Sequence, residues 1–102
     1  MELSYEEQKF KDIPEQEIRS EIILLGFMPL KITNTSGYEY RPHQHPETKM
    51  LVFLEGSMKV KVRDSTYECS KDDMLIIPGN TPHAAEVGQE GCVFFWSEKK
   101  IN

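Results

Sequence analysis

The side chains best suited to chemistry in this sequence are its three histidines. His43 and His45 are two residues apart, whereas His83 lies far along the chain, and no other histidine is present. Because residues two apart on a strand point to the same side, His43 and His45 are expected to project together. With His83 from a neighbouring strand, they could bind one divalent transition metal. Neutral imidazole binds Zn, Fe, Ni, Mn and Cu, so the residue type does not choose among these metals.

The runs that would position these histidines have the pattern of an all-β protein. Short apolar or alternating segments are separated by turn residues at nearly even spacing. We expect strands at 20–25 and 27–33, with a bulge or bend at Gly26. We also expect a hairpin with arms 49–54 and 58–63.

One predicted strand, residues 49–54, is apolar on both faces. One face would line a barrel interior. The other face, with Met50, Val52 and Leu54, needs a second sheet or a partner molecule to cover it. A chain of 102 residues has a modest core. Both observations predict a homodimer.

The sequence does not decide which face of the last predicted strand points into the barrel. Its side chains divide into two alternating sets. Either Cys92, Phe94 and Trp96 point inward, or Val93 and Phe95 do.

Composition excludes several classes of partner. The formal net charge is -5 and no basic stripe offsets it, which argues against nucleic acid. No apolar run approaches the ~20 residues of a membrane span, and the acidic N-terminus does not have the pattern of a signal peptide. We therefore expect a cytoplasmic protein. There, Cys69 and Cys92 are expected to be free, buried thiols, although a disulfide or a reactive cysteine stays open.

The spacing of residues around the histidines resembles the two sequence motifs of the cupin family. The resemblance covers residues 18–97 and includes every histidine of the chain. The residues that carry it are Gly37, His43, His45, position 49 and Gly56 in the first motif, and Asp72, Pro78, Gly79, Asn80 and His83 in the second. The two motifs together are specific, whereas a His-x-His pair alone is often a pair of surface residues.

This resemblance implies an all-β fold, a double-stranded β-helix or jelly-roll barrel, with the metal inside one open end. We expect an N-terminal arm over residues 1–17 and a single barrel over residues 18–102. The usual glycines are replaced by Asp72, expected in an exposed turn, and by Asn80, which tolerates the left-handed conformation. The departure that matters most is Lys49, which stands where the family has a glutamate ligand.

Three interpretations of Lys49 stay open. It could extend its ammonium to solvent and take no part in a site. A bulge at residues 46–47 could instead turn Glu47 inward as the missing carboxylate. If Lys49 shares the face of His43 and His45, burial and a nearby metal would either remove its proton or favour an anion beside it.

The third interpretation makes Lys49 a candidate catalytic residue. A carboxylate, enolate or phosphate could bridge the metal and the ammonium. A neutral lysine could act as a base or as a Schiff-base nucleophile. Phe53 is expected on the same face of the same strand as Lys49, and we expect it to form the wall of the cofactor and ligand pocket.

Two function classes follow from the resemblance. The first is a small metal-dependent enzyme that acts on a small anionic or sugar-derived compound through the three-histidine centre. The alternative is a non-catalytic ligand-binding or sensor barrel, with or without metal. Sensor barrels are usually fused to a further domain, which slightly favours the enzyme.

Overall fold

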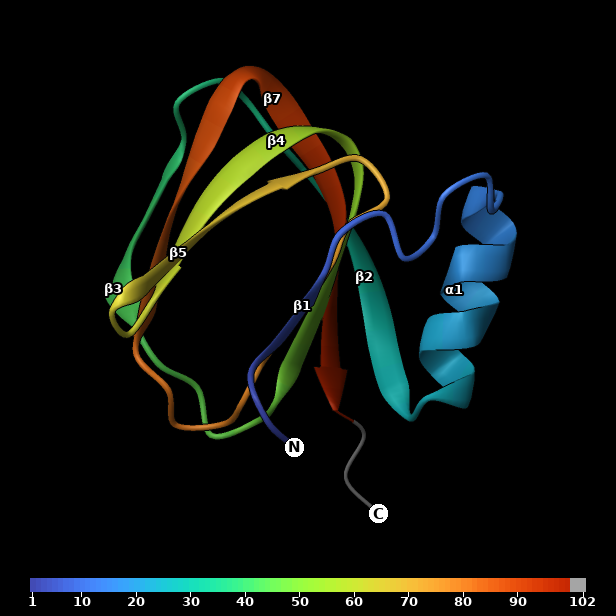
Figure 1. The fold of residues 1–102 in the computed structure, drawn as a ribbon, viewed down its shortest axis with the longest axis horizontal. Coiled ribbons are helices and arrows are strands. Elements are labelled where there is room, and N and C mark those ends of the chain that lie inside the picture. The colour runs from blue at the N-terminus through green and yellow to red at the C-terminus, as the bar shows by residue number, and fades with distance from the viewer. Residues whose placement is uncertain (100–102) are drawn as a thin grey trace.

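The computed structural model describes residues 1–99 and shows an antiparallel β-barrel with one helix beside it (Figure 1). The predicted all-β, jelly-roll architecture is confirmed. In chain order the elements are β1 (Ser4–Glu6), α1 (Glu15–Leu24), β2 (Phe27–Asn34), β3 (Glu39–His43), β4 (Lys49–Val62), β5 (Ser65–Ser70), β6 (Met74–Ile77) and β7 (His83–Lys99).

Two long strands, β4 and β7, run antiparallel to each other and form the frame of the barrel. The first part of β4 pairs with β6 and with the end of β7, and β1 and β2 extend this sheet on either side. The second part of β4 pairs with β5 and with the start of β7, which also pairs with β3. Each long strand therefore belongs to both walls of the barrel.

The two long strands bend at facing glycines. Gly56 has a φ of 74° and Gly91 a φ of 78°, and the β4–β7 register shifts next to Gly56. A Cβ atom on Gly56 would overlap the Gly91 carbonyl oxygen. These contacts let both strands turn the corner together, as bulges and glycines do in barrels.

The predicted hairpin with arms 49–54 and 58–63 is therefore wrong. Residues 55–57 bend a continuous strand instead of reversing it. The reversal comes later, between Val62 and Ser65, which face each other across the turn from β4 to β5.

The barrel interior holds one of the two hydrophobic clusters. It contains buried side chains from β4, β5, β6 and β7. On β7, Cys92 and Phe94 belong to this cluster and Trp96 packs against it, whereas Phe95 belongs to the other cluster and Val93 packs against that one. The first of the two alternatives for this strand is the observed one. Both cysteines are free and buried, and burial raises the pKa of each thiol to about 12.

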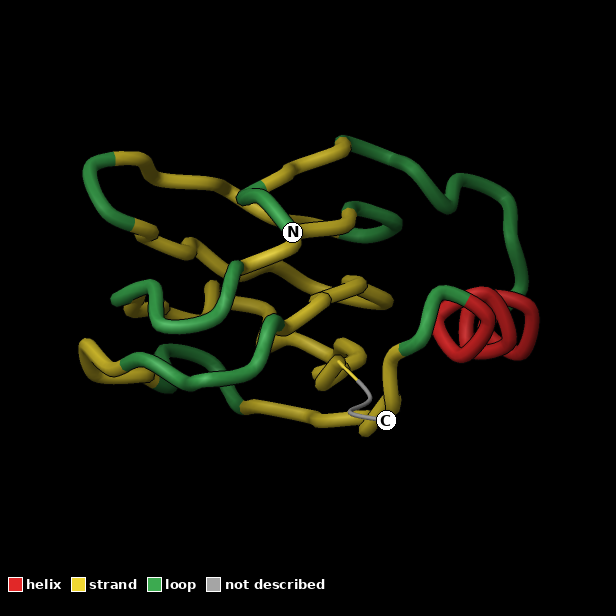
Figure 2. Tube along the Cα trace, turned by 90° about the horizontal axis from the view of Figure 1, so that it is seen from below, coloured by secondary structure: helices red, strands yellow, loops and turns green. Residues whose placement is uncertain are grey.

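The second cluster lies outside the barrel, between α1 and the sheet that contains β6, the first part of β4, the end of β7 and β2. Figure 2 shows the helix beside the strands, seen along its axis. Ile18 and Ile22, spaced at i and i+4, are buried on the face that meets the sheet. The buried members of this cluster are Phe10, Ile18, Ile22, Phe27, Met50, Val52, Leu54, Met74 and Phe95.

This packing corrects two expectations. The strand predicted at 20–25 is wrong, because residues 15–24 form α1, which ends just before Gly26 at a φ of 92°. The outer face of Met50, Val52 and Leu54 is covered by the chain's own helix and arm. Since this face needs no second molecule to cover it, it no longer supports a homodimer.

The N-terminal segment is attached to the barrel through a buried carboxylate. β1 pairs with β6, and Asp73 accepts hydrogen bonds from the Tyr5 hydroxyl and from the backbone N–H groups of Gln8 and Ser70. The boundary expected between an arm at 1–17 and a barrel at 18–102 falls inside α1, and residues 100–102 lie outside the described part. This division stays a prediction. No helix within residues 1–99 is long and apolar enough to cross a membrane.

Candidate metal centre

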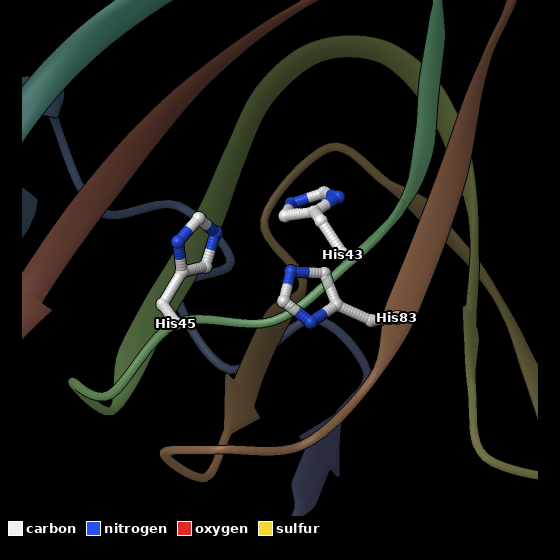
Figure 3. A group of neighbouring side chains, drawn as sticks. All are labelled: His43, His45 and His83. Atoms are coloured by element: carbon white, nitrogen blue, oxygen red, sulfur yellow. The ribbon is translucent and has the colours of Figure 1, made fainter.

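The three histidines come from two paired strands and the loop that follows one of them. His43 is the last residue of β3 and His83 the first of β7, and they face each other in the register. His45 follows in the loop after β3. The three rings gather at one end of the barrel (Figure 3).

The rings are close enough to share one ion. Their centroids are 4.3 Å apart for His43 and His83, 4.7 Å for His43 and His45, and 5.3 Å for His45 and His83. One nitrogen from each ring lies within 4.8 Å of the others. Within residues 1–99, no carboxylate or thiol joins this group.

Two of the rings are oriented by backbone carbonyls. His43 donates from Nδ1 to the Arg41 carbonyl, and His83 donates from Nδ1 to the Thr81 carbonyl at 2.8 Å. A carbonyl oxygen can only accept, so the hydrogen is on Nδ1, and in the neutral ring Nε2 then keeps its lone pair. A partner that fixes the tautomer of a metal-binding histidine is the usual companion of such sites. The sequence did not identify these acceptors, but each lies two residues before its histidine.

The remaining nitrogens fit a metal. Nε2 of His45 and Nε2 of His83 are buried and have no hydrogen-bond partner, which is costly for a polar atom unless a ligand satisfies it. Burial is the main cause that lowers the pKa of both histidines, and nearby Lys49 and His43 lower it further, whereas the Thr81 hydrogen bond raises that of His83. The imidazoles are therefore neutral at pH 7, the form that binds metals.

The loop that carries His45 is held by the second motif. The backbone N–H of Asn80 donates to the His45 carbonyl. A Cβ atom on Gly79 would overlap the Pro46 carbonyl oxygen, so glycine permits this close approach. Asn80 has a φ of 56°, which shows that it adopts the left-handed conformation of the glycine it replaces. Asp72 also has a left-handed φ, of 75°, but it is buried, not exposed as expected.

Lys49 lies on the interior side of β4, with the parity of Leu51 and Phe53. Its side chain is 7% exposed, and its ammonium donates to the Glu98 carboxylate at 2.9 Å. The ammonium also lies 5.2 Å from the centre of the Trp96 ring. It is thus held in the barrel mouth and does not extend into free solvent.

Glu47 does not complete the histidine group. Its carboxylate lies 3.8 Å from the Lys49 ammonium and is therefore a second, weaker partner of that lysine. The hydrogen bond and charge of Lys49 lower the pKa of Glu98. The lysine that replaces the family's glutamate is therefore accompanied by two carboxylates.

The aromatic ring beside the histidines is that of Trp96, whose direction the sequence left open, and not that of Phe53. Phe53 is fully buried and stacks on Phe94 in the core, at a centroid distance of 5.8 Å. It does not line the small cavity of about 20 Å³ beside the histidines, whereas Trp96 does. The Trp96 ring also lies 5.4 Å from the His45 ring. The parity of the last strand was open from sequence, so this aromatic wall could not be assigned.

Known proteins resemble about half of the chain. Acireductone dioxygenase from Alcanivorax borkumensis is 36% identical over 52 residues, which are 47% of this chain and 29% of that protein. Dimethylsulfoniopropionate lyase DddW from Ruegeria pomeroyi is 34% identical over 58 residues, 57% of this chain and 38% of the relative. The chain thus spans only about a third of the length of these relatives.

Solved structures share the fold. An RmlC-like cupin from Shewanella frigidimarina superposes with a TM-score of 0.67 at 21% identity, over 76% of this chain and 68% of that one. Residues 30–98 match the family described as AraC-like ligand binding domain. Since this match covers well over half of the sequence, the chain belongs to the AraC-like ligand binding domain family, and its barrel is a small cupin.

Proposed function

We propose that this cupin is a metal-dependent enzyme that acts on a small anionic or sugar-derived compound. The observation that carries the proposal is the meeting of three imidazoles, two of which keep a buried Nε2 without any partner. His43, His45 and His83 would hold one divalent transition metal. Such an ion, when bound, supplies Lewis acidity or activates oxygen. The relatives named dioxygenase and lyase support a catalytic role.

The chain's own residues favour a ligand with negative charge. Lys49 is the buried cation of the barrel mouth, next to Trp96 and close enough to lower the pKa of His45. A substrate that reaches the three histidines therefore passes an ammonium that can orient an acidic group. The cavity of about 20 Å³ at the histidines is too small for a substrate, so we place the substrate at the mouth.

A second function is a barrel that binds a small ligand without converting it. The observation that favours it is the matched family, whose description is a ligand binding domain. Turnover separates the two functions, because a binding module returns its ligand unchanged.

Metal analysis of freshly purified protein tests the proposal first. The protein should be made without a histidine tag, so that His43, His45 and His83 are its only histidines. We expect about one equivalent of a transition metal, removable by a chelator. His45→Ala and His83→Ala should each lose most of it, since one of the three ligands is gone. Glu68→Ala, on an exposed carboxylate of β5, is the matched control and should retain the metal.

A metal content near zero under metal-replete conditions would contradict this proposal. So would metal that persists in His83→Ala. The homodimer and the cytoplasmic location expected from the sequence stay predictions.

A further inference from the structure

A pocket opens in the barrel mouth next to the histidines. It has a volume of about 240 Å³ and is lined by Met28 and Leu30 of β2, Lys49 of β4, and Trp96 and Glu98 of β7. Trp96 connects the pocket to the centre, since its ring lies near both His45 and the Lys49 ammonium. One side of the pocket is apolar, and its charged side is the Lys49–Glu98 pair.

The two members of this pair are held very differently. Lys49 and Glu98 stand directly opposite in the β4–β7 register, so their side chains meet across the strands. The lysine side chain is 7% exposed, whereas that of Glu98 is 39% exposed. The ammonium is thus fixed in the wall, and the carboxylate approaches it from solvent. Because the Glu98 carboxylate is reached from solvent, another anion can take its place at the ammonium.

A second carboxylate remains beside the Lys49 ammonium when Glu98 leaves. Glu47 lies 3.8 Å from the ammonium, beyond the 2.9 Å of Glu98. An anion that replaces Glu98 would therefore meet an ammonium whose charge Glu47 balances only in part. It would take the closest position, which Glu98 has left.

We propose that Glu98 is a displaceable counter-ion that determines which ligands the site accepts. A ligand that coordinates the metal through one acidic group and carries a second carboxylate or phosphate replaces Glu98 at Lys49. Its body lies on Met28, Leu30 and Trp96. A ligand with only one acidic group gains nothing from Lys49. This inference rests on the proposed function, because the first acidic group needs the metal.

The test uses malonate as the diacid and acetate as the monoacid. Trp96 is the only tryptophan of the chain, so its fluorescence reports binding at this pocket. Both probes are titrated into zinc-loaded protein and into its Glu98→Gln, Lys49→Met and double variants, and zinc content is measured for each. Glu68→Gln is the matched control for the loss of one exposed carboxylate.

We expect Glu98→Gln to bind malonate about two- to fivefold more tightly, because the carboxylate that competes for Lys49 is removed. Lys49→Met should bind it at least about fivefold more weakly. In the Lys49→Met background the gain from Glu98→Gln should vanish, as a double-mutant cycle shows for residues that act on each other. Acetate affinity and the Glu68→Gln variant should show no such change.

Three results would overturn the inference. If Glu98→Gln still tightens malonate binding in the Lys49→Met background, the tighter binding would be a general effect of charge. Unchanged or weaker malonate binding in Glu98→Gln would show that no competitor was removed. Zinc lost from Glu98→Gln would make Glu98 a metal ligand. If the unmutated protein takes up no zinc, the proposed function fails by itself. The same cycle in the metal-free protein then decides the role of Glu98, and no Lys49-dependent gain there would overturn it.

Discussion

At position 49 the charge is balanced by neighbouring residues. A lysine in place of a glutamate changes the local charge by two units, which would leave a metal site strongly cationic. Glu98 at 2.9 Å and Glu47 at 3.8 Å restore two negative charges around the ammonium. The carboxylates lie beside the lysine, outside the group of three histidines that could hold a metal.

Returning a carboxylate to position 49 should strengthen metal binding. Lys49→Glu restores the ligand that the family places here, and with it a negative charge near the ion. Glu98 stands directly opposite and would repel the new carboxylate, so the informative variant is Lys49→Glu combined with Glu98→Gln. We expect it to hold zinc at least about tenfold more tightly in a competition with a chelator.

Glu98→Gln alone is the control for the removed charge. If the double variant binds zinc no more tightly than this control, position 49 does not face the metal, and Lys49 has no part in the site.

The candidate site was predictable only where it depends on local spacing. His43 and His45 are neighbours on the chain, and their shared direction follows from strand geometry. The partner of Lys49 is 49 residues away, and the contact depends on the β4–β7 register, which no local pattern encodes. The place of Trp96 beside the histidines could not be predicted for the same reason, because its inward direction depends on how β7 bends.

At the scale of elements, the close approach of Gly56 and Gly91 makes a bent strand of the residues expected to form a hairpin. Residues 55–57 have the composition of a turn, and the sequence offers no means to distinguish a turn from a bend. The difference lies in the contact of Gly56 with Gly91, 35 positions further along in the sequence. Apart from the strand expected at 20–25, strand positions were predictable from alternation, but the continuity of β4 was not.

Alanine substitutions at two glycines measure this contact. Gly56 and Gly37 have almost the same φ, 74° and 75°, so alanine meets the same backbone strain at both. A Cβ atom at Gly37 meets no atom within 4 Å, whereas at Gly56 it overlaps the Gly91 carbonyl oxygen. We expect Gly37→Ala to lower the free energy of unfolding by about 1 kcal/mol and Gly56→Ala by about 3 kcal/mol or more.

Urea unfolding followed by Trp96 fluorescence gives both values. Equal losses for the two variants would show that the strands do not need the close approach at Gly56. If Gly56→Ala does not fold, the substitution costs more than the free energy of unfolding of the barrel, which agrees with the expected direction.

The helix shows why another element was missed. Ile18 and Ile22 give a helical period, and Glu15 and Glu17 favour the start of a helix. The apolar run that follows, 22–25, hides this period, because it has the composition of a buried strand. In the structure most of that run is exposed.

At the scale of the whole molecule, the exposed apolar residues are concentrated in one segment. Apart from Met1 and Tyr38, the large hydrophobic side chains exposed in residues 1–99 all lie between 23 and 30. They are Ile23, Leu24, Leu25, Met28 and Leu30. Concentrated apolar surface of this kind is typical of protein–protein contacts.

This segment replaces the face of β4 as the expected surface of a homodimer. β2 is the last strand of its sheet, so its outer edge is unpaired within the described chain. A two-fold axis beside the start of β2 would bring residues 23–25 of two copies together, each set covering the other, and would leave Met28 and Leu30 to the ligand pocket. Pro29 has no N–H to donate, so the side chains from Ile23 to Leu25 should contribute more than pairing between edge strands.

We expect light scattering at micromolar concentration to give twice the mass of one chain. Leu24→Gln, at the most exposed of these side chains, should shift the protein towards the monomer by removing apolar contact area without adding charge. Tyr38→Gln is the matched control, since Tyr38 is exposed outside the segment, and it should leave the mass unchanged. A monomeric unmutated protein would refute the dimer, and a dimer that survives Leu24→Gln together with Leu25→Gln would place its interface elsewhere.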